Sequence, residues 1–372
     1  MRVAIVAECF LPETNGVTNS VLRVVEHLER RGYEALVIAP GFGPDSYSRT
    51  PVERVPAVGL PVYRSLSVGL PTGRVKAILR SFRPDVVHLA APFVLGAAGV
   101  RAARTLGIPS VAVYQTDLAG FGARYGLGFA SGATWGWMRW VHNQSDLTLA
   151  PSTLAAWTLR SHGIDPVGMW GRGVDLDRFH PSHRSSLLRR RFSPQGELVA
   201  GYMGRLAAEK QVHLLEPLSR RVGVRTVIIG DGPSATRLRR AMPRATFTGF
   251  QSGAELSAHL ASLDLFVHTG ADETFCQAIQ EALASGVPVV APAAGGPVDL
   301  VRHGDNGLLY PPGAADLVSQ AVAHLAADPP LRATMAARAR RSVEGRSWVA
   351  VGDDLLGHYE SVLGIVRPRR AA

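Results

Sequence analysis

The sequence is poor in cysteine and has no long uninterrupted hydrophobic run. Among its 372 residues, only Cys9 and Cys276 are cysteines, one in each half of the chain. A disulfide framework needs more cysteines and an oxidising compartment, so we expect both to be reduced thiols. Glycine, proline or charge interrupts every apolar stretch before the roughly 20 residues that a bilayer span requires. We therefore expect no transmembrane helix.

The N-terminus lacks the pattern of a signal peptide. Its short apolar run, residues 3–7, meets Glu8 where a signal peptide would still be apolar. The run instead predicts a buried first strand, and we expect a cytoplasmic protein.

Lysine is also scarce, although the chain is basic. The formal net charge is +10, yet the only lysines are Lys76 and Lys210. A lysine in such a chain weakly indicates a site that needs a compact ammonium group, with chance as the alternative. The charge suits a nucleotide diphosphate, an acidic membrane surface or nucleic acid, and it does not choose among them.

Short β-branched runs alternate with amphipathic helical segments along the whole chain. This alternation predicts parallel sheets wrapped by helices, and the length suits two domains. The sequence therefore predicts an α/β fold with two Rossmann-like domains. The predicted strands are 3–7, 34–39, 86–89, 110–114 and 147–150, followed by 198–203, 226–229, 265–268 and 287–291.

Composition sets the expected domain boundaries. Glycine, proline and the basic cluster 189–191 indicate a linker over 172–196, between domains at 1–171 and 197–349. We expect a helix over about 350–372 to pack back on the first domain. Ligands of open α/β sheets bind outside the carboxyl ends of the strands, so the cleft between the two domains is the expected active site.

Two segments carry candidate chemistry. Arg205 and Lys210 follow a predicted strand, and together they could neutralise a diphosphate, with a surface salt bridge to Glu209 as the alternative. A helix that begins near Thr274 would direct its free amides at an anion. Glu273, just before that helix, could instead be only a favourable N-terminal charge. Glu281 lies about two turns further on, where a buried acid needs donors such as ribose hydroxyls.

The order of these features resembles a known family. Arg205 after a glycine, Lys210 shortly afterwards, and then Glu273 and Glu281 with seven residues between them resemble the retaining family 4 glycosyltransferases of GT-B fold, in which two Rossmann-like domains face a cleft. Residues 273–277 and 114–117 look most like the actinobacterial GDP-mannose-dependent α-mannosyltransferases of glycolipid synthesis. The likeness covers essentially the whole chain and continues through 10–17, 281–291, 295–297 and 306–309.

The resemblance implies a transfer of mannose from GDP-mannose to a lipid or small-molecule acceptor. Arg205 and Lys210 would hold the diphosphate in place of a divalent metal, so no cofactor is expected. Glu273 would bind hydroxyls of the transferred sugar and Glu281 those of the ribose. Further contacts to sugar and phosphate would come from the backbone amides of Thr274, Phe275 and Cys276.

The resemblance also implies roles for residues of the first domain. Gly16 would approach the diphosphate closely, as only a residue without a Cβ can, although the family commonly has two glycines where this chain has Asn15 and Gly16. Many relatives carry histidine at Gln115; because glutamine is neither acid nor base, the donor phosphate would accept the acceptor's proton. Asp117 could contribute or could merely end the strand.

Several alternatives remain open at this stage. The same scaffold could use a UDP sugar, since the base depends on contacts near Phe250, or it could be a non-catalytic sugar-nucleotide-binding module. Nucleic acid is not an expected partner, because aromatics do not interleave with the basic clusters. The motif Asp175-x-Asp177 matches metal-dependent glycosyltransferases, but its place in the linker argues against a metal site.

A membrane surface is a further candidate partner. Residues 124–129 and 135–140 are rich in aromatics and arginine, and they could rest at a membrane interface or pack in the core of the first domain. Peripheral attachment to the inner face of the plasma membrane is the corresponding expectation. A basic face adds to it through Arg74, Lys76, Arg80 and Arg83.

Overall fold

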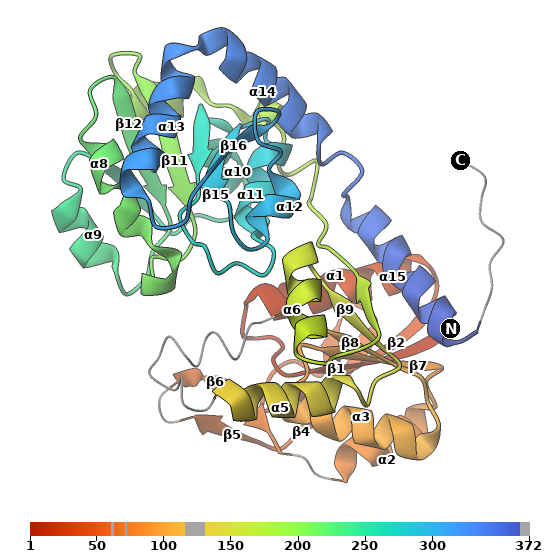
Figure 1. Cartoon of the computed structure of the whole chain (residues 1–372). Coiled ribbons are helices and arrows are strands. Elements are labelled where there is room, and N and C mark those ends of the chain that lie inside the picture. The colour runs from red at the N-terminus through yellow and green to blue at the C-terminus, as the bar shows by residue number, and fades with distance from the viewer. Residues whose placement is uncertain (61–62, 71–72, 116–130, 365–372) are drawn as a thin grey trace. The chain divides into compact units, whose positions relative to one another are not determined.

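Two parallel β-sheets organise the computed structural model (Figure 1). The structure describes residues 1–60, 63–70, 73–115 and 131–364. Met1–Arg172 and the C-terminal segment that begins at Trp348 form one unit, and Gly173–Ser347 form the other. The predicted pair of Rossmann-like α/β domains is therefore confirmed.

The first unit contains an eight-stranded sheet in the order β10-β9-β8-β7-β1-β2-β4-β3, with β5 and β6 forming a separate hairpin. All its neighbouring strands are parallel except the pair β3–β4. β1 is buried along almost its whole length, as expected for a strand covered on both faces. The strands are β1 (Arg2–Ala7), β2 (Glu34–Pro40), β3 (Ser46–Tyr47), β4 (Thr50–Val55), β5 (Ala57–Leu60), β6 (Tyr63–Gly69), β7 (Val86–Ala90), β8 (Ser110–Val113), β9 (Leu147–Ala150) and β10 (Val167–Met169).

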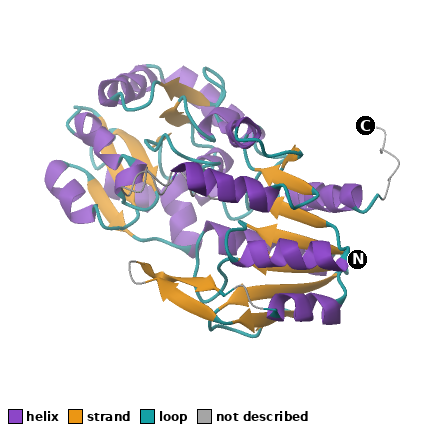
Figure 2. Cartoon of the chain, turned by 60° about the horizontal axis from the view of Figure 1, so that its bottom comes forward, coloured by secondary structure: helices purple, strands orange, loops and turns teal. Residues whose placement is uncertain are grey.

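Helices cover both faces of this sheet (Figure 2). Side chains of α1 and α15 share one hydrophobic core, and those of α2, α3 and α5 share the other. The last helix of the chain thus belongs to the first unit: Tyr359 Oη lies 2.7 Å from His88 Nδ1 on β7, and Trp170 Nε1 donates to the Val351 carbonyl at 2.9 Å. These helices are α1 (Gly16–Arg30), α2 (Arg74–Phe82), α3 (Leu95–Leu106), α5 (Ser131–His142), α6 (Thr153–Ser161) and α15 (Trp348–Val362).

The second unit contains a six-stranded sheet in the order β13-β12-β11-β14-β15-β16, with every neighbouring pair parallel. Its strands are β11 (Leu198–Met203), β12 (Val224–Ile229), β13 (Thr246–Gly249), β14 (Leu265–Val267), β15 (Val289–Pro292) and β16 (Gly307–Tyr310). Its helices are α7 (Ser186–Phe192), α8 (Glu216–Ser219), α9 (Ala235–Ala241), α10 (Gly253–Ala261), α11 (Gln277–Ala284), α12 (Pro297–Leu300), α13 (Ala315–Ala327) and α14 (Pro329–Arg341), with 3₁₀ turns η3 (Pro181–His183), η4 (Ala208–Lys210) and η5 (Val212–Leu215).

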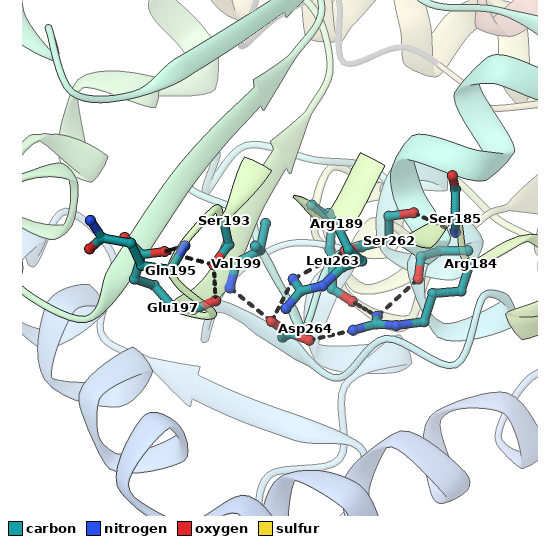
Figure 3. A network of polar contacts seen from close by, with 11 residues as sticks. Arg184, Ser185, Arg189, Ser193, Gln195, Glu197, Val199, Ser262, Leu263 and Asp264 are labelled. Carbon is teal, nitrogen blue, oxygen red and sulfur yellow. Dashed lines mark hydrogen bonds and ion pairs between the residues drawn. The ribbon is translucent and has the colours of Figure 1, made fainter. Parts of the chain in front are cut away.

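The segment with linker composition is ordered from residue 173 onward and packs on the second unit. Asp264 anchors it, because one carboxylate oxygen lies 2.7 Å from Arg184 Nη2 and the other lies 2.8 Å from Arg189 Nη1 (Figure 3). Phe179 and Phe192 are buried in the same core as β11 and β14. The basic cluster around Arg189 therefore has a structural contact in the second unit.

The length and hydropathy of the helices bear on membrane insertion. Over the ranges that the structure describes, none is long and apolar enough to cross a bilayer.

Candidate functional site

The carboxyl edge of the second sheet brings the predicted residues together. β11, β13 and β14 run parallel, so the loops that follow them emerge at one edge. Arg205 follows β11, Phe250 follows β13, and Glu273 lies in the loop after β14. Phe250 is 78% exposed, which leaves an aromatic ring open at this edge.

Lys210 and Glu273 form an ion pair at the centre of this site. Lys210 Nζ lies 2.6 Å from Glu273 Oε1, and both side chains are mostly buried. Burial would raise the pKa of Glu273, but the hydrogen bond from His268 and the charge of Lys210 lower it to about 2. Burial likewise opposes the charge of Lys210, and Glu273 overcomes it so that the pKa of the ammonium is raised. Both groups are therefore charged at neutral pH.

His268 is a third member of the cluster, and sequence reasoning missed it. Its Nε2 lies 3.2 Å from Glu273 Oε1 and 3.6 Å from Cys276 Sγ. Burial lowers the pKa of His268, but Cys276 and Glu273 raise it to about 10. Its position directly after β14 was the available signal in the sequence.

The same cluster offers donor atoms of the kinds that bind transition metals. One ligand atom each from His268, Glu273 and Cys276 lies within 4.8 Å of the others. However, Lys210 already places a positive charge on Glu273 at 2.6 Å. A metal ion at this point would have to compete with that ammonium and with a protonated imidazole.

Arg205 forms a salt bridge with Glu209, the alternative that the sequence analysis gave to a role in diphosphate binding. Its guanidinium contacts the Glu209 carboxylate four residues on, and the Arg205 side chain is 56% exposed. Such an exposed pair contributes little stability. The guanidinium is therefore held only weakly and can be drawn to another anion.

The helix of this site begins later than predicted. α11 starts at Gln277 rather than near Thr274, because Cys276 has a φ of 78° and interrupts the helical conformation. The side chain of Cys276, the N-cap residue, makes no capping hydrogen bond. The preceding loop is held by Gly296, whose amide donates to the Glu273 carbonyl at 2.7 Å. A Cβ on Gly296 would lie 2.3 Å from the Phe275 carbonyl oxygen, so glycine is required there.

The loop before α11 buries two of its side chains. Phe275 and Cys276 are 3% and 6% exposed and belong to the hydrophobic core. Their side chains therefore fix the loop, and any ligand contact from them would use the backbone. Thr274 lies between them and Glu273.

Glu281 lies further along α11 and is half-buried. Burial raises its pKa to about 7, against the opposing effects of the Arg178 charge and a hydrogen bond from Gln277. Gln277 also donates to the Gly173 carbonyl at 3.0 Å. The carboxyl group is thus poised to change its charge near neutral pH.

In the first unit, Asn15 and Gly16 begin α1. Asn15 Oδ1 accepts from the amides of Val17 and Thr18 at 2.9 and 3.0 Å, and its Nδ2 donates to Cys9 Sγ at 3.2 Å. The side chain therefore caps this helix, which a glycine could not do. Two of the amides that could face an anion are already satisfied within the chain.

Arg172 connects two of the predicted residues, and sequence reasoning did not single it out. Its guanidinium donates to the Gly16 carbonyl and to Gln115 Oε1, each at 3.1 Å. A Cβ on Gly16 would lie 3.2 Å from Arg172 Nη1, a tight contact that a small shift of this flexible side chain would relieve. Gln115 is buried after β8, and Asp117 lies outside the described residues.

Two other acidic features have local roles. Glu8 accepts hydrogen bonds from the amides of Phe93 and Gly96 at 2.6 and 2.8 Å, and it thereby satisfies the N-terminus of α3. Asp175 of the Asp-x-Asp motif accepts from the Arg178 amide at 2.9 Å, which closes a turn, while Asp177 is exposed. Neither feature has the arrangement of a metal site.

The chain matches two family descriptions in succession. Residues 14–178 match Glycosyltransferase Family 4, and residues 185–342 match Glycosyl transferases group 1. A GDP-mannose-dependent alpha-mannosyltransferase of Mycobacterium tuberculosis (strain CDC 1551 / Oshkosh) is 52% identical over 371 residues, covering 98% of this chain and 97% of the relative. One from Corynebacterium glutamicum is 50% identical, covering 98% and 90%.

Solved structures share the fold at lower identity. HepE from Anabaena in complex with UDP superimposes with a TM-score of 0.81 at 21% identity, covering 97% of this chain and all of that one. A sucrose-phosphate synthase from Thermosynechococcus elongatus gives a TM-score of 0.78 at 18% identity, covering 98% of this chain and 100% of that one. The predicted GT-B fold is confirmed.

The cap at α1 gives a stability prediction. Asn15→Ala should lower the free energy of unfolding by about 1 kcal/mol, whereas Asn15→Gly should lower it by only a few tenths. Urea unfolding followed by circular dichroism measures both. Asn19→Ala, at an exposed position inside the same helix, is the control and should be neutral or slightly stabilising. Equal effects at positions 15 and 19 would contradict the capping role.

Proposed function

The chain belongs to the family 4 glycosyltransferases, and from this we propose that it transfers mannose from GDP-mannose to a lipid or small-molecule acceptor with retention of configuration. Support for the donor comes from the relatives with 50–52% identity over nearly the whole chain, which are named GDP-mannose-dependent alpha-mannosyltransferases. The observation that carries the donor site is the cluster of Lys210, Glu273 and Arg205 at one sheet edge.

The diphosphate is held by protein cations and not by a metal. Lys210 has three N–H donors, so it can keep Glu273 and still contact a phosphate oxygen. Arg205 is exposed and weakly paired, and its planar fork suits a phosphate. The N-terminus of α11, which the Cys276 side chain does not cap, adds a partial positive charge. The backbone of Thr274, Phe275 and Cys276 directly precedes it.

Two carboxylates orient the donor. Glu273 is ionised and accepts hydrogen bonds from hydroxyls of the transferred sugar, while Glu281 accepts those of the ribose. Phe250 offers its exposed ring to the base. In the first unit, Gly16 is assigned to the diphosphate and Gln115 to the reacting sugar, and Asn15 orders the start of α1. Because Gln115 cannot take up a proton, the donor phosphate accepts the proton of the attacking hydroxyl.

The donor assignment predicts the effect of removing each cation. Arg205→Ala and Lys210→Ala should each lower the turnover of GDP-mannose by roughly 100-fold or more, because charge that develops on the leaving diphosphate loses a partner. Mass spectrometry of mannosylated lipid extract measures the product. Excess EDTA should leave the wild-type rate unchanged.

A matched variant controls for the loss of a surface ion pair. Arg220 pairs with Glu216 four residues away in the same unit, as Arg205 does with Glu209, so Arg220→Ala should keep full activity. Undiminished turnover in Arg205→Ala or Lys210→Ala would overturn the phosphate assignment. A thermal shift with UDP sugars and none with GDP or GDP-mannose would overturn the choice of donor.

The raised pKa of Glu281 predicts a pH dependence of donor binding. Ribose hydroxyls donate to the ionised carboxylate, so binding should weaken as pH falls through the pKa of about 7. The Kd of GDP-mannose should rise roughly tenfold between pH 8 and pH 6. Isothermal titration calorimetry measures it, and Glu281→Gln should flatten the profile. Glu255→Gln, at an exposed position on α10, should retain the wild-type dependence of Kd on pH. A flat wild-type profile would contradict the role of Glu281.

We also propose that the first unit attaches to an anionic membrane surface, where a lipid acceptor would lie. Arg74, Arg80 and Arg83 are exposed on and beside α2. On α5, Trp137 is 37% exposed and stacks on Trp140, with 5.2 Å between the ring centroids. Residues 124–129 of the aromatic stretch lie outside the described part of the chain.

Flotation with liposomes tests the membrane proposal. The protein should rise with vesicles that contain anionic lipid at low salt and lose this association as salt increases, because the basic face supplies the attraction. The triple variant with Arg74, Arg80 and Arg83 changed to Gln should float less. Equal flotation with neutral vesicles would show that charge is not the cause, and no flotation at low salt would contradict the attachment.

A further inference from the structure

His268 lies at the centre of the donor site, yet it has no role in the proposal above. Its side chain is only 3% exposed, and its Nε2 contacts Glu273 Oε1 at 3.2 Å. Lys210 contacts the same oxygen at 2.6 Å. One oxygen of the carboxylate therefore has two cationic neighbours.

The position of the His268 ring is fixed by the strands around it. Its amide donates to the Val290 carbonyl on β15 at 2.8 Å, and its own carbonyl accepts from Tyr310 Oη on β16 at 2.8 Å. The Tyr202 ring on β11 lies nearly parallel to the imidazole, with 13° between the planes. Three neighbouring strands thus hold the residue, whereas the long Lys210 side chain reaches Glu273 from a 3₁₀ turn.

These contacts suggest different roles for His268 and Lys210, which both contact Glu273 Oε1. If Lys210 divides its donors between Glu273 and the diphosphate, as the proposed function requires, a second group on the carboxylate helps to keep Glu273 oriented. We propose that His268 is a positioning residue that holds Glu273 by Oε1, so that the carboxylate keeps its orientation towards the transferred sugar while Lys210 contacts the diphosphate. This inference rests on the proposed function.

The chemistry of the ring suits this role. Burial disfavours a charged imidazole, but Cys276 and Glu273 favour it and raise the pKa to about 10. A protonated imidazole donates from Nε2, and a charge-assisted hydrogen bond to a carboxylate is stronger than a neutral one. A neutral ring with its proton on Nε2 donates at the same point, so the contact does not depend on the charge.

The test compares a ligand that has the sugar with one that lacks it. His268→Ala should raise the Kd of GDP-mannose and lower its turnover by on the order of 100-fold, since a displaced carboxylate no longer meets the sugar. The Kd of GDP should stay within about twofold, because Glu273 is assigned to the sugar alone. His268→Gln, which retains an N–H donor, should recover most of the loss.

Two further variants keep the result interpretable. His213→Ala, at an exposed histidine of the same unit, should match the wild type in both affinities. In a Glu273→Ala background, His268→Ala should cause no additional loss of turnover, because its effect acts through that carboxylate.

Three outcomes would overturn the proposal. Equal loss of GDP and GDP-mannose affinity in His268→Ala would indicate a general structural defect. Full turnover in His268→Ala would show that His268 does not position Glu273. Loss of wild-type GDP-mannose affinity in EDTA would indicate that His268, Glu273 and Cys276 hold a metal. If wild-type protein binds another sugar nucleotide instead, the proposed donor fails, and the same comparison with that nucleotide and its sugar-free diphosphate still tests His268.

Discussion

The parallel pairing of six strands is the constraint on which the candidate site depends. Because β11, β13 and β14 point the same way, the loops after them meet at one edge, although Arg205 and Glu273 are far apart in sequence. Hydrophobic side chains cover both faces of the sheet, so the loops alone are available for polar contacts. The cluster of charges is thus a consequence of strand direction.

Charge balance then decides which groups can be buried at that edge. Burial favours the neutral form of a carboxyl group, and it raises the pKa of Glu281 to about 7 even with the charge of Arg178 nearby. Glu273 avoids this because Lys210 and His268 both contact it. Glu273 and Glu281 therefore differ in pKa for a physical reason that their spacing does not reveal.

Sequence reasoning predicted the fold and the edge residues, because strands and the polar residues after them leave a local pattern. It missed His268 and Arg172, whose partners come from distant segments. It placed the start of α11 too early, since a non-glycine residue with positive φ has no sequence signature. Asn15 looked like a departure from a glycine pair, and the structure gives it a capping role that depends on α1.

Cys276 adopts a left-handed backbone conformation that glycine accommodates without cost. Keeping a side chain there costs on the order of 1 kcal/mol or more in backbone strain. In return, the sulfur reaches His268 and helps to keep its imidazole protonated. Glycine at this position would relieve that strain, but it would leave a cavity where the Cys276 side chain fills the core and would remove the sulfur beside the imidazole.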